Sequence, residues 1–157
     1  MKTVVVISDT HGNVRQIEEL LPIMEESDYV LHLGDGARDM ERFGLKLKGK
    51  LLAVDGNCDP GSLGKTEGVL EAEGVRIFYT HGHLFGVKRG TEELRAYAKE
   101  NGCGAALYGH THRAEAEEEG GVLCFNPGNL SKYTAKRSYG YLVLHDGKIT
   151  WKIVEIF

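Results

Sequence analysis

Five times along the chain, a short apolar run ends in a glycine-containing segment that carries aspartate, asparagine or histidine. The side chains concerned are Asp9 with His11, Asp35, Asn57, His81, and His110 with His112. The runs before them are apolar and several are rich in β-branched residues, which is typical of buried strands. Sites in open α/β sheets form beyond the carboxyl ends of strands, so these segments can converge. The pattern therefore predicts an α/β fold with a polar site at the strand ends.

The rest of the pattern alternates strands and helices at first and then becomes β-rich. We expect strands at 3–7, 29–33, 51–54, 69–72, 75–79 and 105–108, a helix from about Asn13, a short helix between the second and third strands, and a helix at 91–101. Pro22 predicts a kink or an early end of the first helix. The pairs Glu73-Gly74, Gly120-Gly121 and Asp146-Gly147 predict hairpin turns. These elements indicate at least one mixed sheet covered by helices.

Length and composition narrow the class of protein. The chain has 157 residues, of which 41% are hydrophobic and 27% charged, so we expect one globular domain over residues 1–157. The apolar run Val4–Ile7 is too short for a secretory signal or a membrane span. Three scattered cysteines without a CxxC pair indicate neither a disulfide framework nor a zinc ribbon, which fits the cytoplasm. The net charge of −4 excludes a bulk basic surface for polyanions.

The side chains at the strand ends form a set of metal ligands. Two aspartates, one asparagine and four histidines make a mixed oxygen and nitrogen set, which suits Mn, Fe, Co, Ni or Zn rather than calcium. Residues two apart in an extended chain point the same way. Asp9 with His11 can therefore bind one metal ion, and so can His110 with His112. Seven ligands are too many for one catalytic metal. If Asp35 bridges two ions, each ion receives about four bonds and keeps positions for water and substrate.

The spacing of these blocks resembles a known family. Asp9-x-His11, Gly34-Asp35, Gly56-Asn57, His81 and Gly109-His110-x-His112 resemble, in this order, the motifs of the calcineurin-like metallophosphoesterases. The resemblance spans Ser8 to His112, and Asn126-Pro127-Gly128 and the chain length are similar to the small prokaryotic phosphodiesterase branch. It implies a four-layer α-β-β-α sandwich with two mixed β-sheets and a dinuclear metal site at the carboxyl ends of the strands.

The resemblance also implies roles for the ligands. One ion would be held by Asp9, His11, Asp35 and His112, and the other by Asp35, Asn57, His81 and His110. The implied reaction is the hydrolysis of phosphodiesters by in-line attack of a hydroxide that bridges two divalent metal ions. Mn²⁺ is the first expectation, with Ni²⁺, Zn²⁺, Fe²⁺ and Co²⁺ as alternatives, because the ligand types permit all of them.

The chain departs from the family at Cys58. Many relatives have histidine after the Gly-Asn pair, where it serves as an acid for the leaving group. A thiol with an unperturbed pKa of about 8.5 is a weaker substitute for an imidazolium, and Asp59 or His83 are the alternatives for this catalytic role. We therefore expect phosphodiesters with good leaving groups to be preferred over alkyl monoesters.

Several other polar residues are more simply explained as structural or solvated side chains. His32 and His145 are expected to be structural, Asp39, Asp55 and Asp59 to lie in turns or on the surface, and Glu115–Glu119 to form a solvated strand edge. Basic residues that are expected to be solvated, with a phosphate clamp as the alternative, are Lys88, Arg89, Lys132, Lys136 and Arg137.

Three functions stay open on the sequence alone. The first is a two-metal phosphodiesterase acting on a small phosphodiester, with no extended nucleic acid and no membrane as partner. The second is a phosphomonoesterase or nucleotide hydrolase. The third is a non-catalytic binding module, because the same fold resembles a scaffold subunit of retromer. Association into a homo-oligomer is left open.

Overall fold

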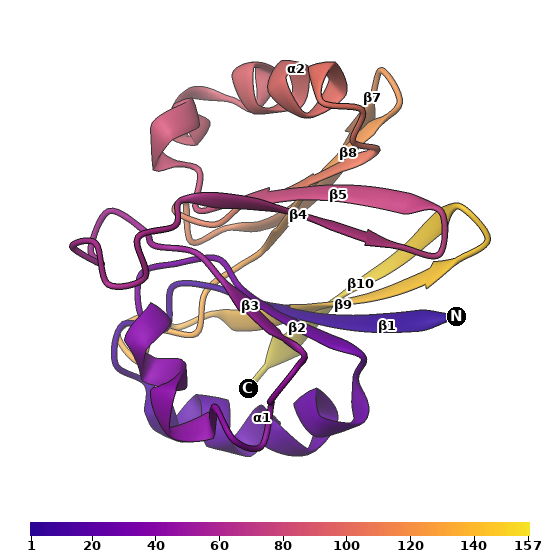
Figure 1. The fold of residues 1–157 in the computed structure, drawn as a ribbon. Helices are drawn as coiled ribbons and strands as arrows, with labels where there is room; N and C mark the ends of the chain where they lie inside the picture. The colour runs from indigo at the N-terminus through magenta and orange to yellow at the C-terminus, as the bar shows by residue number, and fades with distance from the viewer.

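The computed structural model describes residues 1–157 and contains two five-stranded sheets packed face to face, with helices on both outer sides (Figure 1). The first sheet has the order β10-β9-β1-β2-β3, formed by Lys148–Ile156, Arg137–His145, Lys2–Ile7, Tyr29–His32 and Leu51–Ala53. The second has the order β4-β5-β6-β8-β7, formed by Glu67–Ala72, Val75–Thr80, Ala105–Leu107, Val122–Pro127 and Ala114–Glu119. Each sheet mixes parallel and antiparallel pairs. The expected sandwich with two mixed sheets is confirmed.

The helices form the outer layers. α1 (Val14–Glu26) and the 3₁₀ helix η1 (Ala37–Phe43) cover the first sheet, and α2 (Glu92–Glu100) covers the second (Figure 1). Two short 3₁₀ helices, η2 (His83–Phe85) and η3 (Val87–Arg89), lead into α2. No helix in this chain combines the length and the apolarity needed to cross a bilayer.

The first helix corrects one expectation. Asn13 caps α1, because its side chain accepts a hydrogen bond from Gln16 N. The helix then continues through Pro22 to Glu26, so of the two expected effects, a kink or an early end, the early end does not occur. Pro22 is exposed, and the carbonyl that loses its partner belongs to the exposed Glu18 and can bond to water. Burial of the opposite helix face against the sheet outweighs the lost hydrogen bond.

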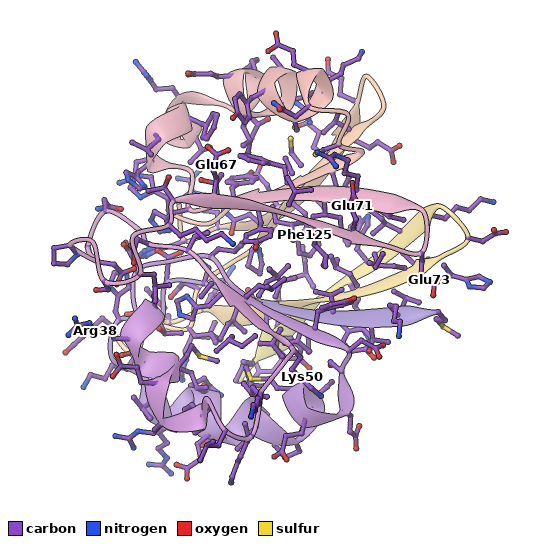
Figure 2. All side chains as sticks on the ribbon, viewed as in Figure 1. Arg38, Lys50, Glu67, Glu71, Glu73 and Phe125 are labelled. Atoms are coloured by element: carbon purple, nitrogen blue, oxygen red, sulfur yellow. The ribbon has the colours of Figure 1, made fainter.

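The strand β1 shows why the apolar runs are continuous rather than alternating. Val4 and Val6 pack between the two sheets, whereas Val5 and Ile7 pack against the helices on the outer side. All four side chains are fully buried, because β1 lies in the middle of its sheet with an apolar layer on each face. Phe125 of β8 fills the space between the sheets (Figure 2).

The two ends of the sandwich differ. The loops that follow β1, β2 and β5 lie at one end, and the hairpin turns β4–β5 and β9–β10 lie at the other (Figure 1). The hairpins predicted at Glu73-Gly74, Gly120-Gly121 and Asp146-Gly147 are confirmed. Gly147 N donates to Glu73 O over 2.8 Å, which joins the two sheets at the hairpin end. The opposite end is left free for a site.

Candidate metal centre

The structure brings the seven predicted ligands together at the end of the sandwich opposite the hairpins. Asp9 and His11 follow β1, Asp35 follows β2 and Asn57 follows β3, all in the first sheet. His81 follows β5, and His110 with His112 follows β6, in the second sheet. Because β1, β2 and β3 are parallel, as are β5 and β6, their carboxyl ends meet at one edge of each sheet. The site therefore spans the junction of the two sheets.

One group of ligand atoms surrounds Asp9. His112 Nε2 lies 3.1 Å from Asp9 Oδ1, and His11 Nε2 lies 3.7 Å from the same oxygen. The two Nε2 atoms are 3.4 Å apart. The ligand atoms of these three residues all lie within 4.8 Å of one another, a spacing that fits a single ion.

A second group surrounds His81. Its Nε2 lies 3.0 Å from Asn57 Oδ1, 3.2 Å from His110 Nδ1 and 3.3 Å from Asp35 Oδ2. Asp35 Oδ2 also lies 3.8 Å from His11 Nε2, so one carboxylate oxygen reaches both groups. Asp35 is therefore placed as the link between the two groups.

The hydrogen bonds of His81 test whether these residues suit a cation. His81 Nδ1 donates to Leu33 O over 2.8 Å, which leaves the lone pair of Nε2 directed into the site. That lone pair meets the Asn57 oxygen and the Asp35 carboxylate, and neither of them has a proton to offer. A convergence of acceptors without donors is stabilised by a cation at its centre, so the side chains fit divalent metal ions.

The ligands sit on an unusual backbone. Seven non-glycine residues in the chain have a positive φ. Five of them are the predicted ligands Asp9, His11, Asp35, His110 and His112, with φ between 42° and 68°. This left-handed conformation is unfavourable for residues with a Cβ atom, and it persists only where surrounding contacts hold it.

Two glycines allow the loops to approach each other. A Cβ atom on Gly34 would lie 2.6 Å from Gly56 N and 3.0 Å from His81 Nδ1. On Gly109 it would lie 2.6 Å from Asp9 Oδ2. Real Cβ atoms do not tolerate such contacts, so glycine before Asp35 and before His110 is a steric requirement of the site.

Asp59 holds the loop that carries Asp35. Its carboxylate is buried and accepts hydrogen bonds from Asp35 N at 2.6 Å, Gly36 N at 2.9 Å and Gly56 N at 2.9 Å. The reading of Asp59 as a turn residue identified its location but not this role. The only signal in the sequence is its place before Pro60 in a glycine-containing turn.

A buried chain of hydrogen bonds ties the loops after β1 and β2. Gly34 N donates to His32 Nδ1 at 3.1 Å, and His32 Nε2 lies 3.0 Å from Thr10 Oγ1. Thr10 Oγ1 donates to Asp39 Oδ2 at 2.6 Å. His32 is structural, as expected, but it supports the loop of Asp35. Burial lowers the pKa of His32 to about 4, and the charges of Asp9, Asp59 and Asp39 offset only part of this shift.

Two asparagines support the loop of His110 and His112 from the far side. Asn126 Nδ2 donates to Gly109 O at 3.1 Å and to Thr111 Oγ1 at 3.0 Å. Asn129 Nδ2 donates to His112 O at 3.3 Å. Reasoning from sequence placed Asn126 in a family motif and missed Asn129, because both act on backbone that lies more than ten residues away.

The charged groups stabilise one another. Burial raises the pKa of Asp9, but the neighbouring imidazoles of His11 and His112 outweigh it and hold the pKa well below its usual range. Burial lowers the pKa of His81, but the neighbouring carboxylates of Asp35 and Asp9 outweigh it and raise the pKa. For His110, burial and the neighbouring His81 lower the pKa. The carboxylates are thus ionised, as metal binding requires.

The three predicted proton donors occupy different places. Cys58 is exposed, and its thiol lies within 4.8 Å of the ligand atoms of His11 and Asp35. Burial and the Asp35 charge raise the pKa of this thiol. The ring of His83 lies 5.3 Å from that of His81, and its buried Nδ1 has no hydrogen-bond partner. Asp59 lies behind the loop, with its carboxylate engaged as described.

The other basic and acidic residues named from the sequence lie around the site or away from it. Lys88, Arg89, Lys132 and Lys136 are exposed, whereas Arg137 is half-buried. Glu115–Glu119 lies in the exposed edge strand β7, as expected. Asp55 is buried and accepts from Leu63 N at 3.0 Å and Gly64 N at 2.8 Å, so it orders a loop rather than facing solvent.

Comparison with known proteins gives a consistent result. The profile of the calcineurin-like phosphoesterase superfamily domain matches residues 1–147. A probable metallophosphoesterase from Bacillus subtilis, YsnB, is 32% identical over 142 residues, covering 90% of this chain and 82% of that protein. The phosphodiesterase YfcE of Escherichia coli is 32% identical over 164 residues, covering 86% and 84%. A crystal structure of a predicted phosphoesterase from Streptococcus pneumoniae superposes with a TM-score of 0.81 at 29% identity, covering 97% and 88%.

Proposed function

Because the chain belongs to the calcineurin-like phosphoesterase superfamily, we propose that it is a phosphodiesterase that works with two divalent metal ions. The observation that carries the proposal is the pair of ligand groups joined by Asp35 Oδ2, which lies 3.3 Å from His81 Nε2 and 3.8 Å from His11 Nε2. A relative that is 32% identical, YfcE, bears the name phosphodiesterase. Mn²⁺ is the metal we propose first, with Ni²⁺, Zn²⁺, Fe²⁺ and Co²⁺ as the alternatives.

The chain's own residues would prepare the site. Asp9, His11 and His112 would hold one ion, Asn57, His81 and His110 the other, and Asp35 both. When bound, two divalent ions supply positive charge for the phosphate and lower the pKa of a nucleophilic water. The protein contributes the geometry. Cys58 N donates to Asp35 Oδ1 over 2.8 Å, which turns the other carboxylate oxygen toward the histidines, and Leu33 O fixes the tautomer of His81.

The proposed proton donors support a preference for good leaving groups. Asp59 lies behind the loop of Asp35 and already accepts three backbone hydrogen bonds. Cys58 and His83 remain nearer to the ligands, and a thiol at position 58 is a weaker acid than an imidazolium. Phosphodiesters with aryl leaving groups would therefore be turned over in preference to alkyl monoesters. Equal rates on matched aryl diesters and alkyl monoesters would contradict this part.

The test is metal-dependent hydrolysis of bis-p-nitrophenyl phosphate by the full chain. Activity should be lost after chelation, return with Mn²⁺, and reach saturation at two ions per chain by metal analysis. Asp35→Asn should lower kcat/KM by about a thousandfold, since each metal contact with the phosphate is worth several kcal/mol. Asp146→Asn is the matched control, because the same chemical change falls in a hairpin turn at the other end of the molecule.

The result discriminates between the remaining functions. Preferential turnover of p-nitrophenyl phosphate over the diester would replace the proposal with a phosphomonoesterase or nucleotide hydrolase. Binding of two ions without turnover of either ester would favour a non-catalytic binding module. Full activity in Asp35→Asn would remove the two-metal mechanism altogether.

A further inference from the structure

A cavity of about 610 Å³ lies beside the loop that carries Asp9 and His11. The residues that matter to its chemistry are Gly12, Arg15, Gln16, Glu19, Lys132 and Arg137. They come from the start of α1, from the segment after β8 and from the start of β9. None of them belongs to the ligand groups described above.

The segment that leads to Lys132 is bonded to the loop that carries Asp9 and His11. Leu130 N donates to Ser8 O at 3.2 Å and to Asp9 O at 3.3 Å. Asn13 Nδ2 donates to Leu130 O at 2.7 Å. These bonds fix the segment that leads to Lys132 against the loop of the ligands. The cavity also borders that loop directly, because Gly12 in its lining follows His11 in the chain.

Positive charge collects in this cavity, although the chain as a whole carries a net charge of −4. Arg15, Lys132 and Arg137 line it, Glu19 is the one acidic side chain among its lining residues, and Phe157, the last residue of the sequence, also lines it. Glu19 is engaged on both sides, because Arg15 Nε lies 3.5 Å from Oε1 and Gln16 Nε2 donates to Oε2 over 3.1 Å. The first turn of α1 holds no acidic residue that would offset the cations.

Arg137 is held in a fixed position. Its Nη1 donates to Gln16 Oε1 over 3.2 Å, and Gln16 is itself buried. The Nε of Arg137 is buried and has no hydrogen-bond partner. The guanidinium is therefore positioned in advance at the wall of the cavity, where the donors of an arginine suit an anion. The sequence favoured a solvated surface position for Arg137, with a phosphate clamp as the alternative, and the structure places the residue half-buried.

A second cavity on the other side of the centre gives the contrast. It has a volume of about 550 Å³ and borders the loop of His110 through Thr111. Its cations, Lys88, Arg89 and Arg113, are matched by Glu92, Glu115 and Glu117. Because the charges balance, this cavity does not select for an anion. The excess of positive charge in the cavity beside the Asp9 loop therefore favours an anion there, and the cavity beside Thr111 has no such excess.

We propose that the basic cavity binds a phosphate group, and that this group is a second phosphate of the substrate in addition to the one that is cleaved. The second half of this statement rests on the proposed phosphodiesterase function. Arginine offers a planar set of donors that matches phosphate oxygens, and lysine adds a mobile charge. Free inorganic phosphate is the other source of the same chemistry.

Binding of inorganic phosphate to the full chain after chelation tests the site without turnover. Calorimetry should show one phosphate per chain, and Lys132→Ala or Arg137→Gln should each weaken it about tenfold, as for charge-assisted hydrogen bonds. Lys136→Ala is the matched control, since it removes the same charge from the same loop outside the cavity. Absence of saturable binding, or equal weakening in all three variants, would overturn the site. Failure of hydrolysis leaves this result unaffected.

Two substrates with one leaving group then identify the source of the phosphate. They are the 5′-(p-nitrophenyl phosphate) esters of thymidine with and without a 3′-phosphate. The 3′-phosphate should raise kcat/KM of the Mn²⁺-loaded protein about tenfold, and the gain should vanish in Lys132→Ala and persist in Lys136→Ala. Phosphate binding without any gain would overturn the substrate assignment and identify free phosphate as the occupant.

Discussion

The two ends of the sandwich use the same left-handed backbone conformation for different reasons. At the hairpin end, Glu73 and Asp146 have φ of 53° and 50°, and each is followed by a glycine with positive φ. Two-residue turns between antiparallel strands demand this geometry, so its cause is local. At the metal end, Asp35 has φ of 58° in a loop whose amides are bonded by Asp59 from another loop.

This difference separates local from tertiary control of the backbone. Glu73 projects at the hairpin end, away from the site (Figure 2). A change there should disturb only a turn. A change in the side chains that bond the ligand loops should move several ligands together, because each loop is hydrogen-bonded to the next.

The largest effect is expected at Asp59. Asp59→Asn replaces one carboxylate oxygen by an amide NH₂ group. This group cannot accept the hydrogen bond of the backbone N–H that faces it, and the position is buried. We expect the free energy of unfolding to fall by about 3 kcal/mol. Metal affinity should weaken about 10- to 100-fold, as for other residues that orient ligands. Chemical denaturation and metal titration measure the two quantities.

Asp146→Asn is again the matched control for Asp59→Asn. It should change the unfolding free energy by less than about 0.5 kcal/mol, because its side chain lies in an exposed turn. If Asp59→Asn were equally mild, the loop of Asp35 would be held by its own preferences, and the distinction between the two ends would disappear.

The next effect concerns pH and His32. Its folded pKa of about 4 lies below the unfolded value of about 6.5, so the unfolded chain binds the proton more readily. Stability from the neutral ring is therefore present above pH 6.5 and is lost as the pH falls through the folded pKa. Between pH 7 and 4.5 we expect a loss of about 2.5 kcal/mol from this residue.

The measurement is urea unfolding of the metal-free protein at several pH values, with His32→Gln beside the wild type. Raised pKa values at His11 and His81 add slope near and above pH 6.5, but they do so in both proteins and cancel in the difference. Lowered pKa values at His83 and His110 add slope to both proteins and cancel in the difference. Parallel curves for the two proteins would show that His32 is not the source.

The same contrast explains what could be read from the sequence. The hairpins were predictable because Glu73-Gly74 and Asp146-Gly147 carry their cause in two adjacent residues. The strands were predictable from apolar runs, and the convergence of the ligands from their places at strand ends. The early helix end expected at Pro22 does not occur, because packing of the buried face of α1 outweighs one missing hydrogen bond.

The residues that support the ligand loops could not be predicted from local sequence patterns. Asp59 bonds Asp35 N from 24 positions away, and Asn126 bonds Gly109 O from 17 positions away. No local pattern reports such a pairing, because a buried aspartate and a turn aspartate look alike in sequence. The same holds for the basic cavity, where Arg15 and Arg137 meet only after the chain has folded.

The smallest effect is expected at Glu73. Glu73→Asn places an asparagine before Gly74, the pair that type I′ turns prefer, because asparagine tolerates positive φ better than glutamate does. The change also removes an exposed ion pair between Glu73 Oε1 and the amino terminus, at 3.0 Å, which contributes little. We expect the unfolding free energy to rise by about 0.5 kcal/mol, with metal affinity and kcat unchanged. A loss of metal affinity in this variant would mean that the hairpin end is coupled to the site through the sheets, and that the backbone at the two ends is not independently controlled.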